Sequence, residues 1–255
     1  MAIYLKKFEN HTQYENYING SGAILPNVSI CTTEGDVHYN PYVEPVETRV
    51  VAKFNVTDIS NPTQIIYEYA DSPFSAIEID GVVQPNVVSA YRFDTIGEHT
   101  VKYTLSNPTS IGSSAFAECS SLTNVTIPNS VTSIGEGAFG NCYNLTSINI
   151  PSGVTSIGDN AFGGTSLTSI NIPNGVTSIG NYTFDGCSGL TSVTIGSVVT
   201  SIGDGAFNNC ESLTSINIPN TLISIGYYAF CGCNLLDAAT VAAIEAISEY
   251  AFWCD

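Results

Sequence analysis

The sequence predicts a mainly β protein in which a repeat solenoid follows a small β-sandwich. A hexapeptide of the form Ile-Gly-x-x-Ala-Phe recurs through the second half of the chain, with successive starts 22 or 23 residues apart. The first half instead holds short β-rich runs separated by turn residues. Charged residues make up only 11% of the 255 residues, a composition that favours many short strands joined by turns over a helical enzyme.

The hexapeptide, here called the first box, occurs seven times, the last copy being degenerate: 111–116, 134–139, 157–162, 179–184, 202–207, 225–230 and 247–252. A second box, Leu-Thr-Ser-Ile-Asn-Ile-Pro with small changes, lies between the copies at 122–128, 145–151, 167–173, 190–196 and 213–219. Ile148 and Ile150 are two residues apart, so a strand places them on one face and Asn149 on the other. Pro151 ends that strand because it has no backbone N–H.

A single coil of this kind cannot bury its own apolar residues. Stacked coils bury them in one continuous core of Leu, Ile, Val and Phe rows. Over residues 110–252 the array resembles the BspA-like leucine-rich repeats of surface proteins from host-associated anaerobic bacteria and some protists. The resemblance implies a leucine-rich-repeat solenoid with an adhesion or protein-binding role outside the cell. It identifies no ligand, because the matching residues are core positions.

Three regions are predicted: an irregular segment with a hairpin over 1–46, a small β-sandwich of immunoglobulin-like type over 47–105, and the solenoid over 106–255 with a C-terminal cap from about residue 233. The sandwich strands are expected at 50–56, 63–69, 76–83, 88–93 and 99–105, with a tight turn at Asp80-Gly81. The last of these strands, 99–105, lies one repeat period before the first copy of the second box, at 122–128. We therefore expect it to begin the solenoid and to form a rigid junction that covers the first coil. The run 235–247 predicts a helix in the cap.

The net charge of -17 is unevenly distributed, since no Lys, Arg or His follows residue 102 while ten Asp and Glu do. This half should repel nucleic acid and anionic membranes. No apolar run is long enough to cross a bilayer, and no secretory signal is visible. The expected partner is a host or bacterial surface protein or a glycan, outside the cell or at its surface if a signal has been removed.

The alternative location is a phage particle. Segments 25–31, 37–41 and 97–105 resemble N-terminal modules of proteins from gut bacteria and their prophages. A structural or host-binding component of a phage particle is therefore the alternative function.

Cysteines recur in the array, three residues after a first-box Phe: Cys119, Cys142, Cys187, Cys210 and Cys233. We interpret them as a ladder of buried, unpaired side chains, because equivalent side chains of stacked coils point the same way and no Cys-x-x-Cys pair or histidine accompanies them. One disulfide among Cys231, Cys233 and Cys254 remains open, with its pairing undecided.

A row of acidic residues follows the first-box glycine at Glu136, Asp159, Asp204 and Glu249, interrupted by Asn181 and Tyr227. Stacked carboxylates could bind calcium. Capping of the short turn that carries Ala-Phe is the favoured interpretation, because no calcium-loop pattern is present. No metal and no cofactor is predicted.

Catalysis is not expected, because the array has no histidine or lysine to activate its many hydroxyl groups. The candidate ligand-binding residues lie on the outward face of the main strands: Asn124, Thr126, Ser147, Asn149, Ser169, Asn171, Ser192, Thr194, Ser215 and Asn217. Such hydroxyl and amide ladders suit a glycan or a multivalent, low-affinity contact. The face lacks aromatic and arginine anchors, so a merely soluble polar sheet surface is the competing interpretation.

Overall fold

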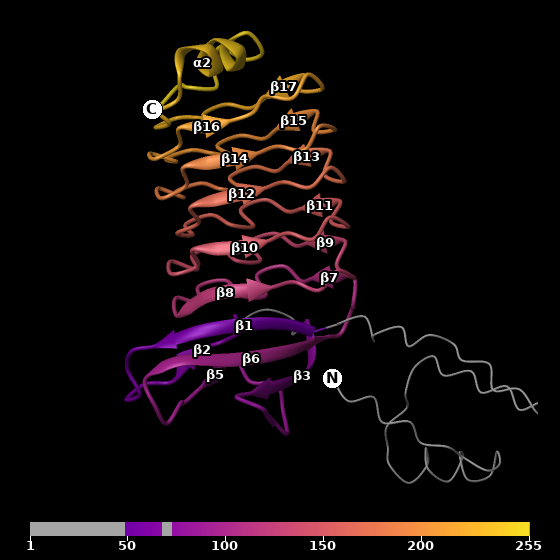
Figure 1. Ribbon diagram of the computed structural model, residues 1–255, viewed down its shortest axis with the longest axis vertical. Coiled ribbons are helices and arrows are strands. Elements are labelled where there is room, and N and C mark those ends of the chain that lie inside the picture. Colours follow the sequence, from indigo (N-terminus) through magenta and orange to yellow (C-terminus); the bar gives the residue numbers. More distant parts are fainter. Residues whose placement is uncertain (1–48, 68–72, 255) are drawn as a thin grey trace, which may run out of the picture. The chain divides into compact units, whose positions relative to one another are not determined.

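The computed structural model describes residues 49–67 and 73–254. They belong to the unit Glu47–Asp255, whose elements are shown in Figure 1. The hairpin expected within 1–46 lies outside the described residues.

Four antiparallel strands and the first two coils of the array share one sheet. Its order is β10-β8-β1-β6-β3-β4, and its members are β1 (Arg49–Val56), β3 (Phe74–Ile79), β4 (Val82–Val83), β6 (Gly97–Leu105), β8 (Leu122–Thr126) and β10 (Ser147–Asn149). A separate pair, β2 (Thr63–Gln64) and β5 (Ala90–Tyr91), is much shorter than the predicted runs. Strand β1 buries Val50, Ala52, Phe54 and Val56, the alternation expected of a strand with one face on a core.

The junction with the array differs from the prediction. Strand β6 does not border the first coil, because β1 lies between β6 and β8. Ala52 of β1 opposes Val125 of β8 in antiparallel register, while the coils pair with one another in parallel. The sequence period predicted that consecutive strands of the chain are also neighbours in the sheet. Strand β1, which precedes β6 in the chain and runs antiparallel to β8, lies between them instead. The core is nevertheless continuous, since the rings of Phe74 and Tyr103 contact Phe116 at 5.3 and 5.1 Å.

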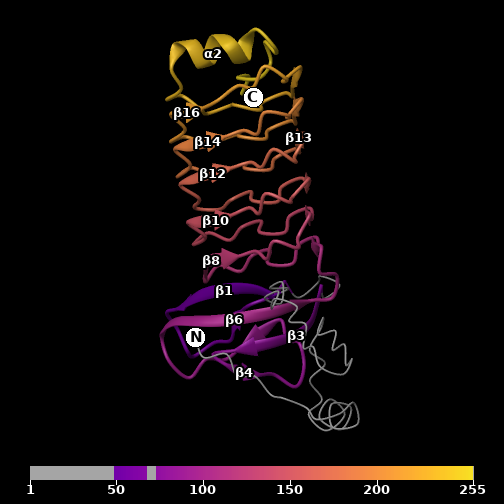
Figure 2. The same ribbon diagram turned by 45° about the vertical axis from the view of Figure 1, so that its right-hand side comes forward.

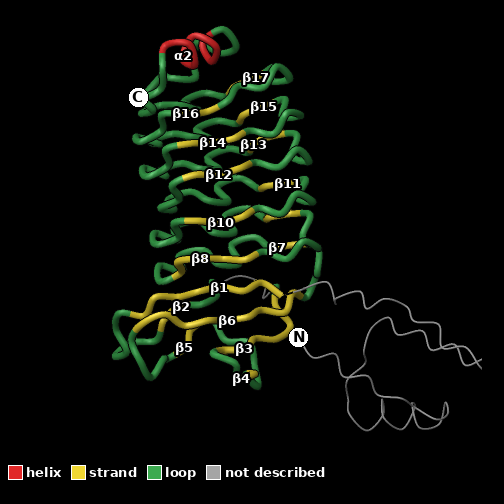
Figure 3. The backbone as a smooth tube through the Cα atoms, viewed as in Figure 1, coloured by secondary structure: helices red, strands yellow, loops and turns green. Residues whose placement is uncertain are grey.

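The coils of the array contribute main strands and second, two-residue strands, which Figure 3 shows as yellow segments. The later main strands are β12 (Ser169–Asn171), β14 (Ser192–Thr194) and β16 (Ser215–Ile216). The second strands are β7 (Ser110–Ile111), β9 (Ser133–Ile134), β11 (Ser156–Ile157), β13 (Ser178–Ile179), β15 (Ser201–Ile202) and β17 (Ser224–Ile225). The coils from β7 to β16 each contribute one strand of each kind, and the next coil contributes only the second strand β17. Within the described residues both strand ladders are interrupted between β10/β11 and β12/β13, where the repeat is 22 rather than 23 residues.

Phenylalanine and glycine of the first box set the spacing of the coils. Six rings, from Phe116 to Phe230, are fully buried and stack with centroids 5.2 to 5.6 Å apart. The glycine lies against the backbone of the preceding coil. A Cβ at Gly158 would lie 2.4 Å from the Glu136 nitrogen, closer than real contacts allow. The first box is thus a packing motif, and the solenoid prediction is confirmed.

The helix α2 (Ala238–Glu245) follows the last complete coil, and Figures 1 and 2 place it beyond β16 and β17 at the end of the stack. It is shorter than the predicted run. Asp237 begins it by accepting hydrogen bonds from the backbone of Ala239 and Thr240, both at 2.9 Å. No helix among the described residues has the length and apolar character needed to cross a membrane.

Candidate functional site

The outward face of the main strands presents hydroxyl and amide groups in register. Ser192 opposes Ser169 on one side and Ser215 on the other, and Asn171 opposes Thr194. In the first coils Asn124 opposes Ser147, and its amide nitrogen donates to the Ser147 hydroxyl at 3.2 Å. Of the ten predicted residues, Asn124 and Ser192 are half-buried and the other eight are exposed. The residues therefore form one polar row of two in-register parts, β8 with β10 and β12 with β14 and β16, and Asn217 lies just beyond the end of β16.

Two open hollows lie along this row. The first, of about 260 Å³, lies over β8 and β10 and is lined by the polar residues Asn124, Thr126, Ser147 and Asn149 together with Val125, Ile127 and Ile148. The second, of about 530 Å³, runs across the ends of β10, β12 and β14, where Asn149, Asn171 and Thr194 line it beside Pro151 and Pro173. The arrangement is an extended surface with shallow relief, which suits contact with a chain-like ligand better than enclosure of a small molecule.

Asn217 has a different role from the other nine residues. Its amide oxygen accepts from the Ile195 nitrogen at 2.6 Å, and its amide nitrogen donates to the Ile195 oxygen at 2.9 Å. The side chain thus replaces the backbone ladder where β16 ends one residue earlier than β14. Asn217 holds the sheet together, which leaves one amide N–H and one lone pair of the amide oxygen for a ligand.

The cysteine ladder is confirmed, with all five members buried and unpaired. Cys142 donates from its sulfur to the Phe116 carbonyl of the preceding coil, 3.0 Å away. In the shorter coil Thr165 takes the position and donates to the Phe162 carbonyl at 2.8 Å. Burial raises the pKa of Cys142 to about 12 and that of Cys187 to about 11. These thiols are therefore protonated at neutral pH and unsuited to be nucleophiles or metal ligands.

The open question at the end of the chain is resolved by a disulfide between Cys231 and Cys254, whose Cα atoms are 5.4 Å apart. Cys231 directly follows Phe230, while Cys254 comes two residues after Phe252. Both lie outside the register of the buried ladder, to which Cys233 belongs. The bond ties the last turn of the cap to the coil before it.

The acidic row holds coils together, and the prediction that it caps turns of its own coil is wrong at Asp159 and Asp204; Asn181, which interrupts the row, makes the same kind of contact. Asp159 accepts from the backbone nitrogen of Asn181 at 2.8 Å, Asn181 accepts from that of Asp204 at 2.9 Å, and Asp204 accepts from that of Tyr227 at 2.8 Å. Each acceptor bonds to the next coil, because the neighbouring glycine brings the coils close. Gly180 shows this, since a Cβ there would lie 2.4 Å from the Asp159 carboxylate. Among the described residues no cluster of three His, Cys, Asp or Glu could hold a metal ion.

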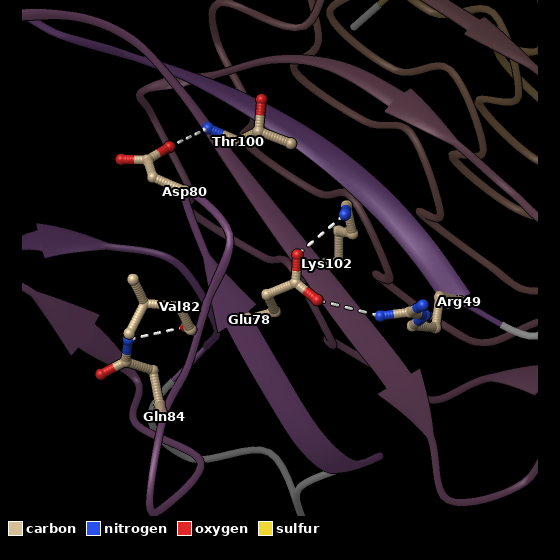
Figure 4. Close-up of polar contacts among 7 residues, drawn as sticks. All are labelled: Arg49, Glu78, Asp80, Val82, Gln84, Thr100 and Lys102. Carbon is tan, nitrogen blue, oxygen red and sulfur yellow. Dashed lines mark hydrogen bonds and ion pairs between the residues drawn. The ribbon is translucent and has the colours of Figure 1, made fainter. Parts of the chain in front are cut away.

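Basic side chains of the N-terminal strands bind acceptors of the same sheet (Figure 4). Glu78 accepts from Lys102 at 2.8 Å and from Arg49 at 3.0 Å. The hydrogen bond from Lys102 is the main reason that the pKa of Glu78 lies below its usual value. Asp80 accepts from the Thr100 nitrogen at 2.9 Å, as the same view shows.

The remaining described cations are also engaged, since Lys53 pairs with Glu98 at 2.8 Å and Arg92 donates to the Ser60 carbonyl. His99 is buried in β6. Its ring nitrogens lie 2.7 Å from an Asp80 carboxylate oxygen and 2.9 Å from the Thr95 carbonyl. Burial alone would lower the pKa of His99, but these two partners raise it above the ordinary value. These groups stabilise the N-terminal strands and form no site.

A family model described as BspA type Leucine rich repeat region matches residues 109–236 and 177–255, in six copies. The chain belongs to the BspA-type leucine-rich-repeat family. This confirms the resemblance inferred from the two boxes. No curated protein sequence matches this BspA-type chain.

Solved leucine-rich-repeat proteins of bacteria are similar to this BspA-type protein. A leucine-rich-repeat protein of T. pallidum is 28% identical with a TM-score of 0.46, over 55% of this chain and 77% of that one. A leucine-rich cell surface protein of Faecalibacterium prausnitzii is 31% identical with a TM-score of 0.40, over 53% of this chain and 42% of that one. The chain therefore spans less than half the length of the Faecalibacterium protein.

Proposed function

We propose that this protein is a non-enzymatic recognition module that works at a bacterial cell surface and binds a neutral, hydroxyl-rich ligand such as a glycan. The observation that carries the proposal is the row of hydroxyl and amide groups on β8, β10, β12 and β14. These groups are in register within each of the two strand pairs, and all are exposed except the half-buried Asn124 and Ser192. Serine, threonine and asparagine side chains both donate and accept hydrogen bonds. They therefore match sugar hydroxyl groups, which do the same.

The charge of the array supports a neutral ligand. No Lys, Arg or His follows residue 102, so an anionic sugar or a sulfated glycan would meet only repulsion. The two hollows follow the row of polar groups. A repeating ligand that contacts several coils at once gains avidity from contacts that are individually weak.

Two further observations support the location and the absence of catalysis. The Cys231–Cys254 disulfide fits an oxidising compartment outside the cytoplasm. The described thiols of the array are buried, and Asp159 and Asp204 already accept hydrogen bonds from the next coil. The family is a repeat scaffold. The family match and the similar solved structures give no support to the phage-particle alternative.

The test is a screen of the whole chain against arrays of neutral glycans, charged glycans and host surface proteins. Asn149→Arg and Asn171→Arg place a long cation in the second hollow, and Ser178→Arg is the matched control on the second strand ladder. We expect binding to neutral glycans, weakened at least about tenfold by the first two variants and unchanged by the control. Binding that survives both variants, or that Ser178→Arg abolishes equally, would refute the assignment to this face.

A further inference from the structure

A second surface lies near the C-terminal end, where four aromatic rings meet on the outside of the stack. This aromatic patch consists of Tyr227, Tyr228, Tyr250 and Trp253. The Tyr227 ring lies 5.1 Å from that of Tyr250, the Tyr250 ring lies 4.7 Å from that of Trp253 in an edge-to-face contact, and Tyr227 and Tyr228 are 6.2 Å apart. Tyr227 and Trp253 are 53% and 56% exposed. The stacked phenylalanines of the core, by contrast, are fully buried.

The rings are held in place by the backbone of the last two coils. The Tyr227 nitrogen donates to the Asp204 carboxylate at 2.8 Å, and the Tyr228 and Trp253 nitrogens donate to the Tyr250 carbonyl at 3.1 and 3.3 Å. The disulfide at Cys254 fixes the residue next to Trp253. The exposed rings are therefore preorganised, which lowers the entropic penalty of using them for binding.

The backbone at Tyr228 is strained. Its φ of 59° lies in the left-handed region, as does the φ of the same box position in the five preceding coils, where the residues are Ser114, Gly137, Asn160, Tyr182 and Gly205. A left-handed conformation costs a residue with a Cβ roughly 1–2 kcal/mol. The conformation therefore belongs to the repeat as a whole, and at this position it directs the Tyr228 ring to the side of Tyr227.

Two acidic residues accompany the rings, and no Lys, Arg or His follows residue 102 in the sequence. Glu249 is exposed and directly precedes Tyr250, and Asp204 accepts from the Tyr227 backbone nitrogen. The Glu249 carboxylate raises the pKa of the Tyr250 phenol, chiefly through a hydrogen bond. Aromatic faces attract cations, arginine above all, and nearby carboxylates add to that attraction.

We propose that the aromatic patch binds an arginine-rich segment of a partner protein. Guanidinium groups stack on the faces of Tyr227 and Trp253, and Glu249 supplies the counter-charge. A neutral sugar also stacks on exposed rings and can donate hydroxyl hydrogen bonds to carboxylates, but only a cation also gains Coulomb attraction from them. The charge pattern therefore favours the cationic segment. The patch shares no residue with the polar strand face, so the two proposals stand or fall separately.

The experiment uses Trp253, the single tryptophan of the chain, as a reporter inside the patch. Its fluorescence is followed while the whole chain is titrated with a capped tetra-arginine peptide, and then with the tetra-citrulline peptide, which has nearly the same shape without the charge. We expect a saturable change with the arginine peptide and none with the citrulline peptide. An equal response to both, or no response to arginine, overturns the proposal.

Variants distinguish binding at the aromatic patch from attraction to the overall negative charge of the chain. Tyr227→Ser and Glu249→Gln should each weaken binding of the arginine peptide by about three- to tenfold. Glu136→Gln removes the same charge from an exposed glutamate at the same box position in an early coil, and it should change affinity less than about twofold. Equal weakening by Glu136→Gln and Glu249→Gln means that the chain attracts cations only through its overall charge. A Trp253 response to neutral oligosaccharides alone means that the patch binds sugar. Either outcome refutes the proposal.

Discussion

Replacing Gly158 by alanine tests how closely the coils approach one another. The added Cβ would lie 2.4 Å from the Glu136 nitrogen and 2.7 Å from the Gly135 carbonyl carbon, both backbone atoms. Gly153, in the same coil, is the matched control. A Cβ there would meet only the carbonyl oxygens of Asn129 and Val131, at 3.6 and 3.8 Å. Neither glycine has a left-handed φ, so alanine suits the backbone at both positions.

The magnitude follows from the geometry. Ordinary contacts begin at 3.4 Å, so the two coils must separate locally by about 1 Å to relieve overpacking, which typically costs about 1–3 kcal/mol. The hydrogen bond from the Gly158 nitrogen to the Ile134 carbonyl, now 2.9 Å long, is lost in the process and contributes about 1 kcal/mol more. The restriction of the unfolded chain by alanine stabilises both variants by about 0.4–1 kcal/mol and cancels in their comparison. Gly158→Ala should therefore be about 3 kcal/mol less stable than Gly153→Ala.

Urea denaturation followed by far-UV circular dichroism measures this difference, provided that both variants show the same dependence on urea concentration. Thermal unfolding should show a gap in Tm of roughly 6–12 °C for a unit of this size. A difference below about 1 kcal/mol would mean that the coils separate easily, and the packing explanation of the first-box glycine would then be wrong.

Three further changes have defined outcomes. Phe162→Ala, which removes a ring stacked at 5.5 and 5.6 Å on both neighbours, should lower the free energy of unfolding by about 3–5 kcal/mol in urea titrations. In a Cys31→Ser protein, denaturation without reductant should expose the five free thiols to a thiol reagent. The folded protein should react slowly with that reagent at about pH 8, because few of its buried thiols are deprotonated. Fewer than five reactive thiols after denaturation would show that the ladder is paired. The folded state holds the His99 proton more tightly than the unfolded state, because the pKa of folded His99 is raised. The stability lost in His99→Gln should therefore be largest below about pH 6.5. The difference from the wild type should shrink as the pH rises through the pKa of folded His99. A difference that grows with pH in urea titrations would contradict that sign.

The repeat could be predicted because every coil is subject to the same packing constraints at the same positions. Phe139 and Phe162 are buried, and Gly135 and Gly158 have no room for a Cβ. The same residue types therefore recur once per period. The position of β1 between β6 and β8 could not be predicted in this way. It depends on pairing between segments some seventy residues apart, as in the hydrogen bond from the Thr123 hydroxyl to the Lys53 carbonyl. A local sequence pattern does not specify which distant strand pairs with the edge of the first coil.

The polar row and its surroundings were predictable to different degrees. Strand alternation predicts from the sequence alone that Ser147 and Asn149 face outward, and the structure agrees. The role of Asn217 was not visible, because it depends on β16 ending earlier than β14. The aromatic patch was also missed, although tyrosine at the fourth box position of the last two coils, Tyr228 and Tyr250, was a signal in the sequence.

The antiparallel strand β1 also has a consequence for the order in which the protein assembles. Since β1 and β6 precede every coil in the chain, a nascent polypeptide presents a finished sheet edge before β8 is synthesised. Each later coil needs only the coil before it, so folding can advance from the N-terminal side as the chain emerges. The Cys231–Cys254 disulfide can form only after both cysteines have been synthesised, when an external oxidant takes up two electrons and two protons from the two thiols. We expect nascent chains halted after β10 to resist protease already, and the C-terminal coil to acquire that resistance last.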